Sequence, residues 1–198
     1  MSFGLCAVFL INGADCSAVA QDAATKKKPP ESSPEALAVY GDAANFQNNR
    51  VYQIAETEWV KFLAKFPDDP LAAKAQHYLG ICCLKLKKLD DAGAAFQKVV
   101  SKYPAFELTE EAYLNLGWCQ FTLAQGKENE SEQLERAKQT FARMLTLFPP
   151  GKGGKCDQAL FFQAETLYGL NEKQAAADSY ARLITGFRES TLYRDALY

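Results

Sequence analysis

The stretch LGICCLKLKKLDDAGAAFQKVVSKYP, residues 79–104, decides the fold. A small residue, Gly80, stands 12 positions before a second small residue, Ala92. Phe96 follows Ala92 by four positions, and the stretch ends at Tyr103-Pro104. Small residues at matching positions let two helices approach closely, and a proline stops a helix because it lacks the backbone N–H. The stretch therefore predicts a pair of antiparallel helices.

The second half of this stretch recurs four times along the chain. In each copy an alanine is followed four positions later by an aromatic residue and 12 positions later by the end of the segment. The copies run Ala55, Trp59, Pro67; Ala92, Phe96, Pro104; Ala137, Phe141, Pro149; and Ala176, Tyr180, Arg188. A fixed period of a few tens of residues is the signature of a stacked repeat protein. One helical pair cannot bury its apolar face alone, so neighbouring pairs must cover it.

The repeats predict an all-α fold, because no alternating strand pattern bounded by hairpin turns is present. The expected helix pairs are 35–48 with 51–66, 71–86 with 89–103, 109–125 with 132–148, and 156–169 with 173–187. The third pair contains eight extra residues, which match the polar stretch 125–133 and are interpreted as an insertion in its turn. A fifth helix is expected near Thr191. Since solenoids normally end in a capping helix, we expect that further sequence follows Tyr198.

The first 34 residues differ from the repeats. Residues 3–11 form a short apolar run, and Ala18-Val19-Ala20 is a small-x-small triplet, so residues 1–20 are predicted to be a secretory signal peptide that lacks a basic n-region. The apolar run is too short to span a membrane, which needs about 20 residues. Residues 21–34 are polar and predict a disordered linker. Residues 35–198 form the predicted repeat domain of about four repeats and the start of a fifth.

The spacing of Leu79-Gly80, Ala92, Phe96 and Pro104 resembles the tetratricopeptide repeat. The same spacing returns at Leu116-Gly117, Ala137, Phe141 and Pro149, with the insertion, and the resemblance covers residues 35–198. It implies a right-handed α-solenoid whose first helices line a concave groove. The endings Phe66 to Pro70 and Tyr103-Pro104 look like bacterial cell-envelope members, such as the periplasmic Tol–Pal coordinator and the outer-membrane β-barrel assembly lipoprotein. That narrower resemblance implies a periplasmic or envelope-associated protein.

The residues that carry chemistry favour no enzyme, no cofactor and no metal site. Four cysteines lie in the repeats, at Cys82, Cys83, Cys119 and Cys156, without a CxxC pair, and His77 is the only histidine. A zinc site needs four ligands at workable spacing, so these cysteines are interpreted as small buried hydrophobic residues. The segment 151–155 (GKGGK) lacks the spacing and the preceding strand of a phosphate loop, and is interpreted as a loop between repeats. A net charge of −2 gives no reason to expect a nucleic-acid partner.

The concave groove is the candidate site, because the positions that should face it are unusually apolar and aromatic. The predicted groove residues are Tyr40, His77, Ile81, Leu84, Leu114, Trp118, Phe121, Phe161 and Tyr168. The alternative for some of them is a place in the core or against a following helix. The pattern lacks the Lys and Asn clamp of family members that grip acidic C-terminal peptides, so an apolar peptide or protein face is the expected ligand. The predicted function is a protein-binding adaptor of the cell envelope. The alternative is a structural spacer or a module that self-associates through its C-terminal end.

Overall fold

The computed structural model describes residues 31–125 and 130–197. Within these ranges it contains eight α-helices, one short 3-10 helix and no strand. The helices are α1 Pro34–Asn48, α2 Tyr52–Lys65, α3 Ala72–Lys85, α4 Leu89–Lys102, α5 Thr109–Ala124, α6 Glu130–Leu147, α7 Cys156–Gly169, α8 Lys173–Gly186 and the 3-10 helix η1 Asp195–Leu197. The expected signal peptide, residues 21–30 of the expected linker and the middle of the insertion lie outside the described residues.

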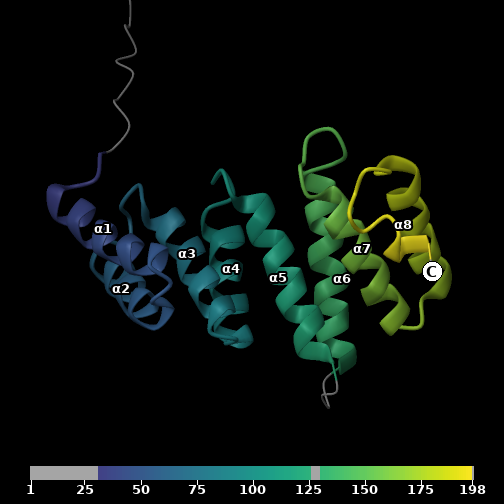
Figure 1. The fold of residues 1–198 in the computed structure, drawn as a ribbon, viewed down its shortest axis with the longest axis horizontal. Helices are drawn as coiled ribbons and strands as arrows, with labels where there is room; N and C mark the ends of the chain where they lie inside the picture. The colour runs from purple at the N-terminus through teal and green to yellow at the C-terminus, as the bar shows by residue number, and fades with distance from the viewer. Residues whose placement is uncertain (1–30, 126–129, 198) are drawn as a thin grey trace, which may run out of the picture.

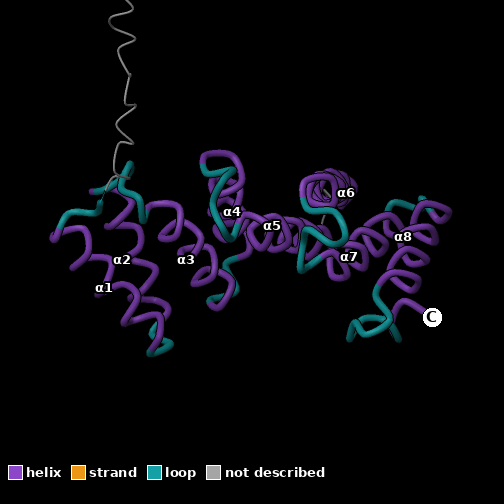
Figure 2. Tube along the Cα trace, turned by 90° about the horizontal axis from the view of Figure 1, so that it is seen from above, coloured by secondary structure: helices purple, strands orange, loops and turns teal. Residues whose placement is uncertain are grey.

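The helices follow one another across the molecule in chain order, and each packs on the next (Figure 1). Seen from above, α4 and α6 lie to one side of α3, α5 and α7 (Figure 2). The first helices of the pairs, α1, α3, α5 and α7, are called the inner helices here, and α2, α4, α6 and α8 the outer helices. The predicted all-α solenoid of antiparallel pairs is confirmed, and every helix end lies within two residues of its expected position.

Two departures from the sequence prediction lie at the insertion and at the C-terminal end. The third outer helix, α6, has 18 residues where the other outer helices have 14. Its added turn begins with Glu130 and Glu132, and acidic residues favour the start of a helix. The expected fifth helix is a turn that leads into η1, where the Ser190 hydroxyl accepts a hydrogen bond from the Leu192 amide. The same hydroxyl donates to the Asp157 carboxylate of α7 at 2.6 Å, which holds the turn against the fourth pair.

The contact that closes each central pair joins a glycine to an aromatic ring. A Cβ atom on Gly80 would lie 2.7 Å from the Phe96 ring, and one on Gly117 would lie 2.6 Å from the Phe141 ring. Both rings are fully buried, as is Trp59 in the first pair. The fourth aromatic residue, Tyr180, is only partly buried. The missing glycine side chain therefore makes the room that the ring of the facing helix fills.

The turns within three of the pairs share one unusual backbone conformation. Arg50, Lys87 and Asn171 have φ values of 60°, 60° and 61°, and each stands five residues before the small residue of its repeat. The left-handed region costs a residue with a side chain about 1–2 kcal/mol. The third pair has the insertion at this place. The repeat thus fixes the geometry of the turn as well as that of the helices.

Ion pairs link neighbouring outer helices, α2 with α4 and α6 with α8. They stand at equivalent repeat positions, with the acidic and basic residues exchanged. Lys88, just before α4, lies 2.7 Å from Glu56 of α2, and Lys138 of α6 lies 2.5 Å from Glu172, just before α8. Exposed pairs of this kind contribute at most about 1 kcal/mol each. The apolar contacts between repeats therefore supply most of the stacking energy. The ion pairs help to fix how one outer helix is aligned with the next.

We expect Phe96→Ala to lower the free energy of unfolding by about 3–5 kcal/mol, because it empties a fully buried site. Gly80→Ala alone is expected to cost about 1–3 kcal/mol, because its methyl group collides with the ring. In the double variant the added methyl group meets no ring, so its cost should largely vanish. Chemical denaturation of the four proteins measures this coupling, and additive effects would contradict the proposed contact.

We expect Lys87→Gly to raise the free energy of unfolding by about 0.5–1 kcal/mol, because glycine adopts a positive φ without steric cost. The matched control is Lys98→Gly, which places the same new residue inside α4 at an exposed position and should lower stability by about 1 kcal/mol. Thermal unfolding of both variants gives the sign. A lowered melting temperature for Lys87→Gly would show that the lysine side chain matters more than its backbone angle.

Candidate binding groove

A cleft of about 450 Å³ opens on the inner helices α3, α5 and α7. Its apolar walls come from Ile81 and Leu84 of α3, Trp118 of α5 and Phe162 of α7, and Leu114 of α5 lies in the same lining. We call this the inner cleft. Leu114 is buried, whereas Ile81, Leu84, Trp118 and Phe162 are each partly exposed. The repeat period produces this arrangement, because it brings equivalent helix faces of three successive repeats side by side.

The structure brings four of the nine predicted groove residues into this cleft: Ile81, Leu84, Leu114 and Trp118. The other five lie on the inner helices but do not line it. Tyr40 packs edge-on against Trp59 at 4.9 Å, and Phe161 packs against Tyr180 at 6.1 Å, so both belong largely to the packing within their own pairs. Tyr168 is 64% exposed and lies apart from the cleft.

His77 is a buried residue in the structure, and not a groove residue with a free side chain. It is 1% exposed and packs against the Phe96 and Phe106 rings at 5.6 and 6.1 Å. Its Nε2 atom lies 3.5 Å from Glu111, while Nδ1 has no hydrogen-bond partner. Burial lowers the pKa of His77, and Glu111 only partly opposes this shift, so the ring is neutral at pH 7.

Phe162 was missed by the sequence prediction, which placed its neighbour Phe161 in the groove. Successive residues on a helix point about 100° apart, so a one-residue difference decides which ring faces the cleft. Phe162 stacks on Phe141 at 6.2 Å and contacts Phe121 at 6.1 Å. The predicted residue Phe121 thus supports the cleft wall through Phe162. A pair of adjacent phenylalanines gives no sequence signal for which ring is turned inward.

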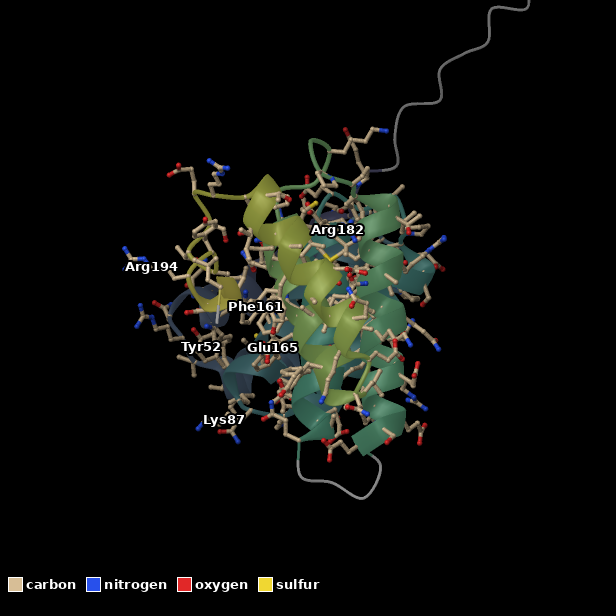
Figure 3. All side chains as sticks on the ribbon, turned by 90° about the vertical axis from the view of Figure 1, so that its right-hand side faces the viewer. Tyr52, Lys87, Phe161, Glu165, Arg182 and Arg194 are labelled. Carbon is tan, nitrogen blue, oxygen red and sulfur yellow. The ribbon has the colours of Figure 1, made fainter. Side chains whose placement is uncertain are left out.

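The lining of the inner cleft carries charges of both signs. It includes Lys85 of α3 and Glu111 of α5, and the side-chain amides of Asn115 and Gln158. The cleft therefore combines apolar, charged and amide side chains, as protein-binding surfaces commonly do. Figure 3 looks along the array from its α8 end, where Phe161 and Glu165 of α7 lie to the left of α8 and Arg182 of α8 lies to its right.

The four cysteines of the repeats are free and buried, as predicted. Burial raises the pKa of Cys82 and Cys119 to about 12 and that of Cys83 to about 11, and it also raises the pKa of Cys156. These thiols stay protonated at neutral pH, and a protonated thiol is a poor nucleophile and metal ligand. Over residues 31–125 and 130–197, no cluster of three or more His, Cys, Asp or Glu side chains could hold a metal ion.

The glycine-rich segment 151–155 joins two repeats, as predicted. A carboxylate from the neighbouring repeat, Glu110 of α5, accepts hydrogen bonds from the backbone amides of Gly154 and Lys155 at 3.2 and 2.9 Å. A carboxylate at the start of a helix is favourable, because it meets the positive end of the helix dipole. The amides that could have bound a phosphate at the start of α7 are thus paired within the chain.

The chain is a helical-repeat solenoid in which the same pair geometry returns in each repeat. Tetratricopeptide repeat models match residues 41–106 and 111–150, which together make up more than half of the sequence. The chain belongs to the tetratricopeptide repeat family. The fourth pair, α7 with α8, lies beyond the matched residues and keeps the same antiparallel arrangement. Repeats of this family are typically protein-binding scaffolds.

The structure is similar to the crystal structure of a tetratricopeptide repeat protein from Parabacteroides merdae, with a TM-score of 0.67 and 16% identity. The match covers 83% of this chain and 58% of that one, so the chain spans a little over half of that neighbour's length. A thermophilic repeat protein from Thermus thermophilus gives a TM-score of 0.47 at 17% identity, with 82% and 98% covered. PilW, a type IV pilus biogenesis factor, gives 0.38 at 22% identity, with 82% and 83% covered.

No curated protein sequence matches the chain significantly. Among the described helices, none combines the length and the apolar character needed to cross a membrane.

We expect the chain to become less stable as the pH falls from about 7.5 to about 5.5, through the ordinary histidine pKa of about 6.5. The folded pKa of His77 is lowered, so the unfolded chain binds the proton more readily and acid favours unfolding. Well above pH 6.5 the contribution is fully retained, and the loss grows as the pH falls below 6.5. Since His77 is the only histidine, its ring proton signal in NMR reports the folded pKa directly.

The control for this prediction is His77→Phe, which fills the site among the aromatic rings without a titrating group. Its melting temperature should fall less between the two pH values than that of the unchanged chain. An NMR titration with a midpoint at or above 6.5 would contradict the buried, neutral assignment.

Proposed function

We propose that the chain is a non-catalytic adaptor of the bacterial cell envelope that binds an apolar face of a protein partner in the inner cleft. The observation that carries the proposal is the convergence of Ile81, Leu84, Trp118 and Phe162 from three repeats on one open cleft. Aromatic residues in such a surface tend to supply most of the binding energy. Membership of a family of protein-binding repeats supports a protein as the ligand.

The form of the cleft suits an amphipathic helix or an apolar peptide. Its volume of about 450 Å³ accommodates several apolar side chains, and its walls run across three helices instead of enclosing a small molecule. A partner helix places its apolar side chains at i, i+3 and i+4, which can enter a groove of this kind together. Lys85 and Glu111 in the lining of the cleft would pair with charges of opposite sign beside the apolar stripe.

The envelope location rests on the N-terminal sequence, which lies outside the described residues. The apolar run at residues 3–11 and the triplet Ala18-Val19-Ala20 support export, with residues 1–20 as signal peptide, 21–34 as linker and 35–198 as the repeat domain. The resemblance of the Phe66–Pro70 ending to envelope proteins supports the same location. The protonated state of the buried thiols supports a structural role for the cysteines.

The decisive experiment is photo-crosslinking in intact cells from position 118 of the full-length protein. We expect a discrete adduct with another protein, because the Trp118 side chain lines the open cleft. A crosslinker at Ala142, exposed on the outer helix α6, is the matched control and should not give that adduct. Adducts with a second copy only, or none at all, would favour a structural spacer or self-association module instead.

A purified partner then allows the cleft to be measured directly. Trp118→Ala should weaken binding by more than about tenfold, as expected for a central aromatic contact. The control is Leu147→Ala, which removes an apolar side chain that is 42% exposed at the end of α6 and does not line the inner cleft. Equal losses in both variants would argue against the cleft as the binding site.

A further inference from the structure

A row of four cations runs along the outer helices. Lys61, Lys98, Arg143 and Arg182 each stand six residues after the small residue of their repeat and four residues before the end of their helix. All four are exposed. We call them the outer cation row. One side chain of the same charge thus returns at the same position in every repeat, on a chain whose net charge is −2.

Stabilisation of the helices does not account for this row. The favourable interaction of a cation with the helix dipole falls off within the last turn, and the row lies just before that turn. The last turns of α6 and α8 carry no basic residue. Within the described part of the chain, Lys61 pairs with Glu58, whereas Lys98, Arg143 and Arg182 have no carboxylate within ion-pair distance. Three strong donors are therefore left to solvent.

Two clefts on the outer side place this row beside neighbouring helices. The first, of about 350 Å³, lies between α2 and α4 over α3 and combines the apolar Leu63 and Leu79 with Lys98 and Lys102. The second, of about 480 Å³, lies at the equivalent place between α4 and α6. It carries Arg143 together with Arg136 of the same helix. Each cleft thus has two cations in its lining, one of which is already paired: Lys102 lies 3.5 Å from Asp68, and Arg136 lies 2.7 Å from Glu132. Lys98 and Arg143 are the cations of the two linings without an ion pair in the described part of the chain.

The lining of the first cleft also contains a buried amide without a partner. Gln76 of α3 is 6% exposed, and its Nε2 atom has no hydrogen-bond partner. A buried donor without an acceptor is unfavourable, and most such groups in proteins are paired. A carbonyl or carboxylate oxygen that enters the cleft would supply the acceptor. The amide of Gln76 and the unpaired Lys98 thus favour the same chemistry, an oxygen acceptor with negative charge.

We propose that the two outer clefts form a binding site for an extended acidic segment of a partner protein. An apolar side chain of this segment enters the first cleft against Leu63 and Leu79, and carboxylates face Lys98 and Arg143. Arginine and lysine clusters recognise acidic motifs through charge-assisted hydrogen bonds. The site is separate from the inner cleft, since the two share no residue.

A peptide fits the outer clefts better than a bilayer or a nucleic acid does. The apolar residues Leu63 and Leu79 are partly buried between helices, so a single side chain can reach them, whereas a bilayer lying on this side would touch the projecting helices first. Single-stranded nucleic acids are held by stacking on aromatic platforms beside the cations. In the first cleft only Tyr103 is aromatic, and the cation of Lys102 already lies 5.3 Å above its ring.

The test uses the full chain and a fluorescent peptide of about 12 alternating glutamate and leucine residues, which spans about 40 Å when extended. Fluorescence anisotropy should show binding that weakens as salt shortens the Debye length from about 10 Å at 0.1 M to about 3 Å at 1 M. The double variant Lys98→Glu/Arg143→Glu should bind the peptide at least about tenfold more weakly. Neither side chain has an ion pair to lose, so the fold should be retained, as circular dichroism would verify.

The matched control is Lys173→Glu/Arg188→Glu, which changes the net charge equally at exposed positions outside both clefts. It should keep the affinity within about twofold. Equal losses in the two double variants would overturn the proposal, because net charge alone would then explain the binding. Stronger row-dependent binding to anionic lipid vesicles or to an oligothymidine than to the peptide would also overturn it, in favour of that other ligand.

Gln76→Leu provides an independent measurement. If the amide serves only the fold, replacing it with an apolar side chain should leave peptide affinity unchanged. If it donates to the ligand, affinity should fall while the melting temperature holds or rises, because the unpaired buried donor has been removed. Unchanged peptide affinity would show that the Gln76 amide does not contact the ligand, and it would overturn the proposal for the first cleft.

Discussion

The contact between a glycine and an aromatic ring across each central helix pair is the constraint on which the array depends. Gly80 and Gly117 leave no room for even one additional carbon atom beside the rings of Phe96 and Phe141. This close approach sets the separation of the two helices and presents their combined apolar face to the next repeat. Each pair contacts mainly its neighbours, so the helix separation within one pair also determines how the next pair packs on it.

The same repetition gives the two sides of the array different chemistry. Residues at a given repeat position line up along one side, so a preference at that position becomes a continuous surface. On the inner helices it produces an aromatic cleft around Trp118, and on the outer helices it produces a row that includes Lys98 and Arg143. The residues of the inner cleft also pack against the core, whereas the exposed cations of the outer row do not. The packing of small residues against rings therefore leaves the outer row the freer of the two surfaces to vary with the ligand.

The helices and their pairing follow from the sequence, because the spacing of Ala92, Phe96 and Pro104 reflects helix contacts that recur in each repeat. The site was only partly predictable. The repeat spacing assigns equivalent positions of the inner helices to the groove, but it does not show how much of each side chain is buried. His77 is one such position, and rings from α4 and the following loop bury it. The choice between Phe161 and Phe162 depends on about 100° of rotation. The outer cation row went unnoticed because the net charge of the chain averages over its sides.

Helix α3 lies beneath both proposed sites, and its geometry argues that they act independently. Leu79 lines the first outer cleft, while Ile81 lines the inner cleft two residues later, about 200° around the helix. Between them, Gly80 is held against the Phe96 ring with no space to shift. Coupling between sites needs an element with two arrangements of similar energy. A helix fixed in this way offers only one, so an acidic segment outside and an apolar face inside can be held at the same time.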